Sequence, residues 1–149
     1  MAAVLRPDDV AFLEEQRVAR LATVDATGKP HVVPVCFAWV ESRLYVPIDA
    51  KPKHGDPRNL ARLRNLRARP EAVLLVDYYN DDWRRLRWLM IRATAAILDS
   101  GPERARALTT LEDRYPQYAA MKLASLNLPV IALTPVTIRR WTATPNQPT

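Results

Sequence analysis

The stretch RVARLATVDATGKPHVVPVCFAWVESRLYVPI, residues 17–48, decides the fold class of this 149-residue chain. Residues 17–24 and 31–40 are rich in β-branched and apolar side chains, which is typical of strands. The cluster DATGKP at 25–30 is a turn signal, so the two segments are predicted to form a hairpin. The short turn ESR then leads into a third strand at 44–48. Three strands joined by tight turns indicate an antiparallel sheet.

The remaining chain adds strands and short helices to this sheet. Apolar runs predict further strands at 71–79, 84–98 and 129–143. Capping and spacing signals predict helices within 1–16, from Asp56 to Arg69, from Gly101 to about Tyr118, and at 121–126. Hairpins predominate over βαβ units in this order, which favours a barrel or mixed α+β fold. We expect one domain over residues 1–149, with a frayed tail at 144–149.

Composition excludes several classes of protein. Hydrophobic residues make up 48% and charged residues 26%, as in ordinary globular proteins. No apolar run approaches the ~20 residues of a membrane span, and the first fifteen residues lack the apolar centre of a signal peptide. We therefore expect a cytoplasmic protein with no membrane partner. The single cysteine, Cys36, and only two histidines argue against disulfides, a metal site or a Ser–His–Asp triad, and Cys36 is expected to be a buried, inert thiol.

The positive charge is concentrated in one segment. The formal net charge is +6, from 22 basic and 16 acidic residues. Residues 51–69 hold seven of those cations and one acid, Asp56, so 15 basic and 15 acidic residues remain elsewhere. This focusing predicts an anionic partner bound at one place. The segment contains no aromatic residue on which a base could stack, which argues against nucleic acid.

The anion site is predicted where the basic loop meets the following helix. Lys51 and Lys53 lie two residues apart and project to one side of an extended segment. The pair Asp56–Pro57 predicts a helix start, whose free N–H groups favour an anion, and Arg58 and Asn59 follow in its first turn. The three glycines are scattered, so no glycine-rich phosphate loop is available.

The other arginines of this helix, Arg62, Arg67 and Arg69, are interpreted as a solvated face.

No nucleophile or general base stands out. A phosphate site, an aromatic side chain such as Trp88 and no evident catalytic residue suit chemistry performed by a bound cofactor, which the protein orients.

Five segments together resemble the pyridoxamine-phosphate-oxidase-like split barrels, and in particular the branch that uses coenzyme F-420, a deazaflavin. They are RLATV (20–24), HVVPVCF (31–37), DAKPK (49–53), RLRNLRARPEAVLLVDYY (62–79) and WLMIRATA (88–95). The resemblance runs from about Arg17 to Trp141. It implies a split β-barrel with short flanking helices, forming a homodimer with two cofactor sites at the subunit interface.

The resemblance also implies roles for individual residues. Lys51 and Lys53 would hold the cofactor phosphate, and Arg20 falls where the flavin enzymes keep a phosphate-binding arginine. A bulged segment, Val33, Pro34 and Val35, would lie along the ring system, with Trp88 near it. Arg58 and Asn59 would reach the phosphate or the acidic tail of the deazaflavin.

Two departures separate the chain from the flavin-dependent vitamin oxidases of this family. Those enzymes carry Ser-Arg-Lys where this chain has Lys51-Pro52-Lys53, and Gln where it has Trp88. The expected function is therefore deazaflavin-dependent hydride transfer to an unsaturated or quinone-like small molecule. An FMN-dependent oxidoreductase and a non-catalytic cofactor or tetrapyrrole carrier remain the alternatives.

Overall fold

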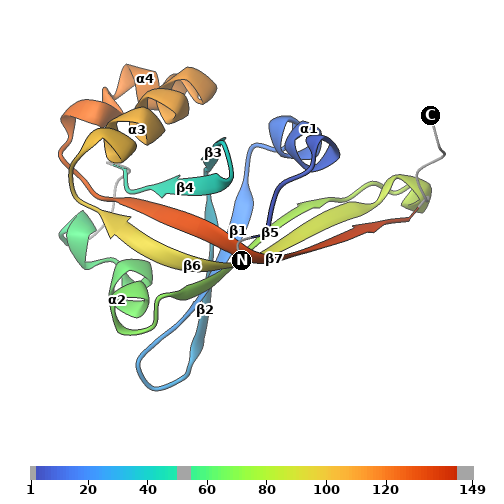
Figure 1. Ribbon diagram of the computed structural model, residues 1–149, viewed down its shortest axis with the longest axis horizontal. Coiled ribbons are helices and arrows are strands. Elements are labelled where there is room, and N and C mark those ends of the chain that lie inside the picture. The colour runs from blue at the N-terminus through green and yellow to red at the C-terminus, as the bar shows by residue number, and fades with distance from the viewer. Residues whose placement is uncertain (1–2, 50–54, 144–149) are drawn as a thin grey trace.

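The computed structural model describes residues 3–49 and 55–143. Within them lies one antiparallel sheet of seven strands in the order β2-β1-β5-β6-β7-β4-β3 (Figure 1). The strands are β1 (Ala19–Val24), β2 (Pro30–Val35), β3 (Ala38–Val40), β4 (Arg43–Pro47), β5 (Glu71–Tyr78), β6 (Arg87–Leu98) and β7 (Val130–Thr142). The expected split-barrel fold, a sheet curled on itself with short helices around it, is confirmed.

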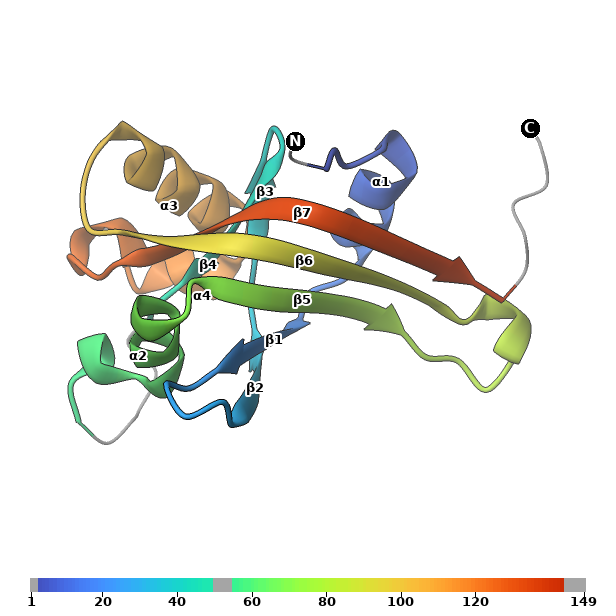
Figure 2. The same ribbon diagram turned by 60° about the horizontal axis from the view of Figure 1, so that its bottom comes forward.

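Short helices flank the curled sheet. The α-helices are α1 (Pro7–Glu15), α2 (Ala61–Ala68), α3 (Pro102–Arg114) and α4 (Pro116–Ala120), and the 3-10 turns are η1 (Pro57–Asn59), η2 (Trp83–Arg85) and η3 (Leu123–Ser125). Strands β5, β6 and β7 cross the front of the molecule in Figure 2, and α1, α3 and α4 lie behind them. None of the helices in the described part of the chain is long and apolar enough to span a bilayer.

The core fills the inner face of the curl. Because side chains alternate along a strand, residues paired across neighbouring strands share one face. Leu21, Leu74 and Ile91 are paired in register on β1, β5 and β6, and all three are fully buried. Phe12 and Leu13 of α1 belong to the same core cluster. A second cluster lies between α3 and the sheet. Leu108 and Leu111 of α3 belong to it, together with Tyr45 of β4 and Ala132 of β7.

The predicted hairpin is confirmed, but the predicted single strand over 31–40 is wrong. β1 pairs with β2, and the chain then breaks at Cys36 and Phe37 before β3 begins at the opposite edge of the sheet. The reason is that the backbone of Phe37 bonds to a side chain rather than to a strand. Its N–H donates to the Tyr115 hydroxyl at 3.1 Å, and that hydroxyl lies 3.0 Å from the Phe37 carbonyl oxygen. Cys36, expected to be buried, is half-buried at this corner.

Arg114 holds the same corner from the end of α3. Its guanidinium donates to the carbonyl oxygens of Phe37, at 3.0 Å, and of Leu13, at 2.9 Å. It also lies over the rings of Phe37 and Trp39, 5.0 and 4.8 Å from their centroids. One half-buried cation therefore joins α3, the end of α1 and the β2–β3 corner.

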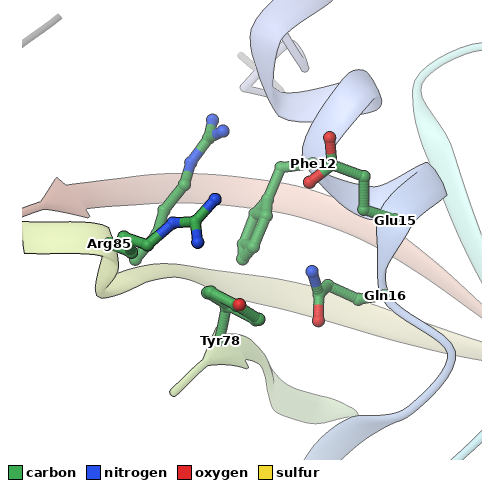
Figure 3. A pocket seen from close by; sticks show the side chains of 6 residues that line it. Phe12, Glu15, Gln16, Tyr78 and Arg85 are labelled. Carbon is green, nitrogen blue, oxygen red and sulfur yellow. The ribbon is translucent and has the colours of Figure 1, made fainter. Parts of the chain in front are cut away.

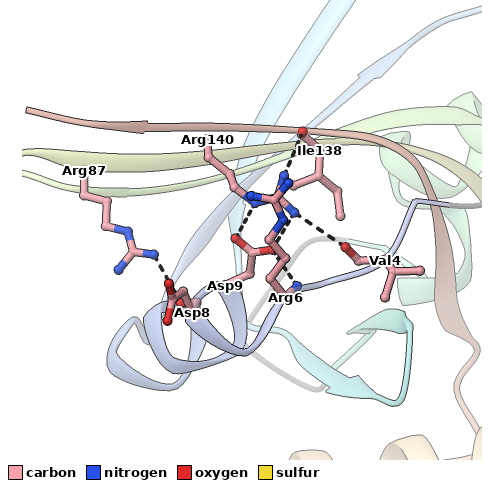
Figure 4. Close-up of polar contacts among 7 residues, drawn as sticks. All are labelled: Val4, Arg6, Asp8, Asp9, Arg87, Ile138 and Arg140. Atoms are coloured by element: carbon pink, nitrogen blue, oxygen red, sulfur yellow. Dashed lines mark hydrogen bonds and ion pairs between the residues drawn. The ribbon is translucent and has the colours of Figure 1, made fainter. Parts of the chain in front are cut away.

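Helix α1 is anchored to the strands on both sides. Phe12 points from α1 toward η2 and lies beneath the Arg87 guanidinium, 4.5 Å from ring centroid to Cζ (Figure 3). Asp9, which is 1% exposed, accepts two hydrogen bonds from Arg140 of β7, at 2.7 and 2.6 Å (Figure 4). It accepts a third from the backbone N–H of Arg6, at 2.7 Å. Burial alone raises the pKa of Asp9, but these bonds outweigh it and hold the pKa below its ordinary value of 3.8.

Asp9→Asn is expected to lower the free energy of unfolding by about 2–3 kcal/mol at pH 7, because it removes the charge that Arg140 binds. The folded-state pKa is depressed, so this stabilisation is complete above the unfolded-state pKa and disappears as the pH falls through the folded-state pKa. Urea unfolding should therefore show a difference between wild type and Asp9→Asn that shrinks in acid. The exposed neighbour provides the control, Asp8→Asn, and an equal loss in both variants would contradict the assignment.

Candidate functional site

The outer face of the sheet carries a row of side chains that are exposed or half-buried in the described chain. Arg20 of β1, Leu75 of β5 and Met90 of β6 are paired in register and point away from the core row. Apolar residues nearby are strongly exposed, at 65% for Val32 and 50% for Val136. Figure 2 shows β5, β6 and β7 with this face open toward the viewer. Exposed apolar side chains on one face make that face a candidate binding or association surface.

A shallow groove of about 380 Å³ runs across this outer face. It is lined by Ala22, Thr23, Val24, Pro30, Glu71, Ala72, Val73, Arg92, Ala93, Thr94 and Val136. The lining is apolar along the strands, while Glu71 and Arg92 supply one charge of each sign. Such a surface suits a flat apolar ring with a few polar groups.

An aromatic pair lies toward the other end of the outer face. Trp88 of β6 is paired with Trp141 of β7, and their rings stack with centroids 6.4 Å apart and planes 17° apart. Trp141 is 41% exposed, and Trp88 is half-buried. The pair offers a flat apolar surface, and the role of Trp88 as a cofactor wall stays a prediction.

The residues predicted near the ring lie on both faces of the sheet. Arg20 and Pro34 are cross-strand partners on the outer face that also carries Trp88. Val33 is half-buried and Val35 is buried, because alternation turns them to the inner face. The expected bulge at this segment is wrong, since β1 and β2 pair one to one from Ala19 and Val35 to Val24 and Pro30.

The residues predicted to bind phosphate are only partly described. Lys51 and Lys53 lie outside the described residues. Asp56 caps the 3-10 turn η1, accepting from the Arg58 N–H at 2.9 Å, so the predicted helix start at Asp56 is wrong and α2 begins at Ala61. Arg58 and Asn59 are therefore exposed residues of η1. The Arg58 guanidinium donates to the Asn127 carbonyl oxygen at 2.9 Å and lies 3.7 Å from Asp56.

The predicted solvated face of α2 needs one correction. Arg67 and Arg69 are exposed, as expected, but Arg62 is half-buried and its Nε is fully buried. The reason is that Arg62 lies one helical turn before the buried Leu66 and shares its side of the helix.

A buried polar contact missed by sequence reasoning adjoins the basic stretch. Asp49 lies two residues after the end of β4 and is 3% exposed, and it accepts from the Tyr118 hydroxyl of α4 at 3.0 Å. Burial, with contributions from Cys36 and Asp49, raises the pKa of Tyr118. The signal available in the sequence was the position of Asp49, between a buried strand and Lys51.

A second cavity, between α1 and η2, was also missed. It measures about 390 Å³ and is lined by Phe12, Glu15, Gln16, Tyr78, Arg85 and Arg87 (Figure 3). None of the residues predicted to bind a cofactor line it. Its lining comes from residues about 70 positions apart, which no local pattern brings together.

The predicted residues lie toward two ends of β6. Arg58 and Asn59 precede α2, which packs near one end, and Trp88 lies near the other. α2 packs on β1 and β6, and the Ala95 N–H of β6 bonds to the Pro70 carbonyl oxygen that follows the helix. Trp88 lies seven residues before Ala95, roughly 20 Å away along an extended strand.

The chain is similar to known proteins over nearly its whole length. A family model described as pyridoxamine 5'-phosphate oxidase matches residues 5–142. A 5a,11a-dehydrotetracycline/5a,11a-dehydrooxytetracycline reductase of Streptomyces rimosus is 31% identical over 99 residues, which cover 66% of this chain and 67% of that protein.

Two solved structures illustrate the similarity of fold. A conserved hypothetical protein of Mycobacterium tuberculosis superposes with a TM-score of 0.77 at 16% identity, covering 99% of this chain and 93% of that one. An F-420 reductase superposes with a TM-score of 0.61 at 25% identity, covering 87% of this chain and 94% of that one. With the curled seven-stranded sheet, these similarities show that the chain belongs to the pyridoxamine 5'-phosphate oxidase family.

Proposed function

We propose that this protein is a deazaflavin-dependent oxidoreductase that transfers hydride between reduced coenzyme F-420 and an unsaturated or quinone-like small molecule. The observation that carries the proposal is the similarity to a dehydrotetracycline reductase within this family. The F-420 reductase of the same fold supports the choice of cofactor.

The described residues fit such a cofactor. A flat ring needs an apolar surface, which the Trp88–Trp141 pair and the outer-face groove provide. A phosphate-bearing tail needs cations, which residues 51–69 concentrate. The bound cofactor would supply the hydride chemistry, while these side chains orient it and exclude water from one side of the ring. No side chain is assigned as the proton donor.

A second copy of the chain would complete the site. One copy presents cations near α2 and an indole wall roughly 20 Å away along β6. Pairing two outer faces would bring the basic stretch of one copy toward Trp88 of the other, and would cover the exposed Val32 and Val136. We therefore propose a homodimer with cofactor sites at its interface.

The alternative cofactor is FMN, because the matching family is that of pyridoxamine 5'-phosphate oxidase. Lys51-Pro52-Lys53 and Trp88, which replace residues of the flavin enzymes, favour the deazaflavin.

Titration of the purified protein with each cofactor tests the choice between them. The proposal predicts tight quenching of deazaflavin fluorescence and weaker binding of FMN, followed by oxidation of the reduced deazaflavin when a quinone is added. Binding of FMN alone would establish the alternative. Binding of either cofactor without any turnover would make the protein a carrier.

Lys53→Ala is expected to weaken binding of the phosphorylated cofactor by ~1.5–3 kcal/mol, because it removes one charge-assisted bond to the phosphate. Isothermal titration measures the change. Lys29→Ala, in the β1–β2 turn, is the matched control and should leave affinity unchanged. Equal affinity of wild type and Lys53→Ala would remove the phosphate role of Lys53.

Val73→Arg is expected to convert the dimer into monomers, because it places a second guanidinium directly opposite Arg92 in the outer-face groove. Sedimentation velocity measures the change, and circular dichroism checks that the fold is kept. Thr109→Arg, on the exposed side of α3, is the control. A variant that stays dimeric would place the interface elsewhere, and a wild type that is monomeric would end the dimer proposal.

A further inference from the structure

The cavity between α1 and η2 lies on the other face of the sheet from the proposed cofactor surface. Arg87, which lines the cavity, is the neighbour of Trp88 on β6, and alternation along a strand turns the two side chains to opposite faces. Arg87 lies over the buried ring of Phe12, on the face that carries the core. Trp88 stacks on Trp141 on the outer face. A ligand in this cavity would therefore occupy a second site.

One wall of the cavity carries positive charge that the protein does not use. Arg85 and Arg87 line this wall, and Figure 3 shows the Arg85 side chain extending toward Phe12. Among the described residues, none accepts a hydrogen bond from the Arg85 guanidinium or forms an ion pair with it. Asp82 is an acid that its charge reaches, but the Asp82 carboxylate accepts from the Arg84 guanidinium at 2.9 Å through each oxygen. Arg85 is left with its donors directed at the cavity.

The loop that carries Arg85 is held in place by its own hydrogen bonds. The side-chain amide of Asn80 donates to the Tyr78 hydroxyl at 3.0 Å, and its oxygen accepts from the Asp82 N–H at 2.8 Å. The Asp82 carbonyl oxygen accepts from the Arg85 N–H at 3.0 Å. The backbone at Tyr78 and Arg85 is thus fixed without a ligand, which lowers the entropic cost of binding one.

The end of α1 gives the cavity a wall of opposite charge. Glu15 and Gln16 line it, and Figure 3 shows them on the side of Phe12 away from Arg85. In the part of the chain that the structure describes, Glu15 forms no ion pair, so it does not neutralise Arg85. The ring of Tyr78, which is 38% exposed, supplies apolar surface to the same cavity.

These walls specify the chemistry of a ligand. The volume of about 390 Å³ lies in the range of small-molecule sites. Two guanidinium groups against one carboxylate favour an anion, and the planar guanidinium fork matches a carboxylate with two parallel bonds. The Tyr78 ring favours a flat apolar body. Glu15 accepts hydrogen bonds and repels a second negative group, so it favours a hydroxyl or amino donor at the far end.

We propose that the cavity between α1 and η2 is a binding site for a small aromatic carboxylate. The carboxylate accepts from Arg85, the ring packs on Tyr78, and a hydroxyl or amino group opposite the carboxylate donates to Glu15. The site is separate from the proposed cofactor site and does not depend on which cofactor binds there.

The test uses para-hydroxybenzoate as the probe, with two comparison ligands. Para-hydroxybenzamide has the same shape without the charge, and terephthalate places a second carboxylate toward Glu15. Binding is followed by NMR, which gives the affinity and identifies the amide signals that shift. Wild type is compared with Arg85→Gln and Glu15→Gln. The matched controls are Arg106→Gln and Glu14→Gln, which replace exposed residues outside the cavity lining.

Wild type is expected to bind para-hydroxybenzoate and to shift the amide signals of Gln16 and Tyr78. Arg85→Gln should lower this affinity about tenfold, to that of the amide, because it removes one charge-assisted interaction at a position that water partly screens. Glu15→Gln should bind terephthalate more tightly than wild type does, because the repulsion is gone. Both control variants should match wild type with every ligand.

Equal affinity of wild type for the acid and its amide, or equal affinity of wild type and Arg85→Gln for the acid, would overturn the proposal. Shifts confined to other parts of the chain would also overturn it. If Arg85→Gln does not fold, Arg85→Lys keeps the charge without the planar fork and should still bind more weakly than wild type.

A second titration separates this proposal from the proposed function. Coenzyme F-420 is titrated into the protein with and without saturating para-hydroxybenzoate. Unchanged cofactor affinity supports two separate sites, whereas competition would place the cofactor in this cavity and overturn the second site. A wild type that binds the cofactor but not the probe overturns this proposal alone, and one that binds the probe but not the cofactor overturns the proposed function alone.

Discussion

The curl of the sheet follows from one short connection. β2 and β3 lie at opposite edges of the seven-stranded sheet, yet only Cys36 and Phe37 join them. A flat sheet would separate its edges by about 29 Å, six spacings of about 4.8 Å, whereas the three Cα steps from Val35 to Ala38 span at most about 11 Å. The sheet must therefore close on itself. Tyr115 and Arg114 fix the corner by binding the backbone of Phe37 in place of a neighbouring strand.

Closure gives the two faces of the sheet different surroundings. The inner face is filled by Leu21, Leu74 and Ile91, with helices packed around it. Along the same strands, alternation turns Leu75, Met90 and Trp88 outward, where they are half-buried in the described chain. Covering this face with a cofactor and a second copy would bury apolar surface that a single copy leaves in water. The core and the proposed site therefore lie on opposite faces of the same strands, and the strand registers determine which residues each contains.

Local signals in the sequence predicted the parts of the molecule that depend on neighbours in the chain. The β1–β2 hairpin follows from two β-branched segments around a turn, and Pro34 lies on an edge strand, where its missing N–H is tolerated. The break at Phe37 was not predictable, because its partner Tyr115 lies 78 residues away. The start of α2 was misplaced because Asp56 and Pro57 begin a 3-10 turn as readily as an α-helix. The burial of Arg62 was not predicted, because it depends on how α2 packs against β1 and β6.

The crystal structure of the protein with coenzyme F-420 bound tests the central claim most directly. The account predicts two copies related by a twofold axis, with the deazaflavin ring between their outer faces beside Trp88. A cofactor lodged in the cavity between α1 and η2, with the outer face bare, would contradict it.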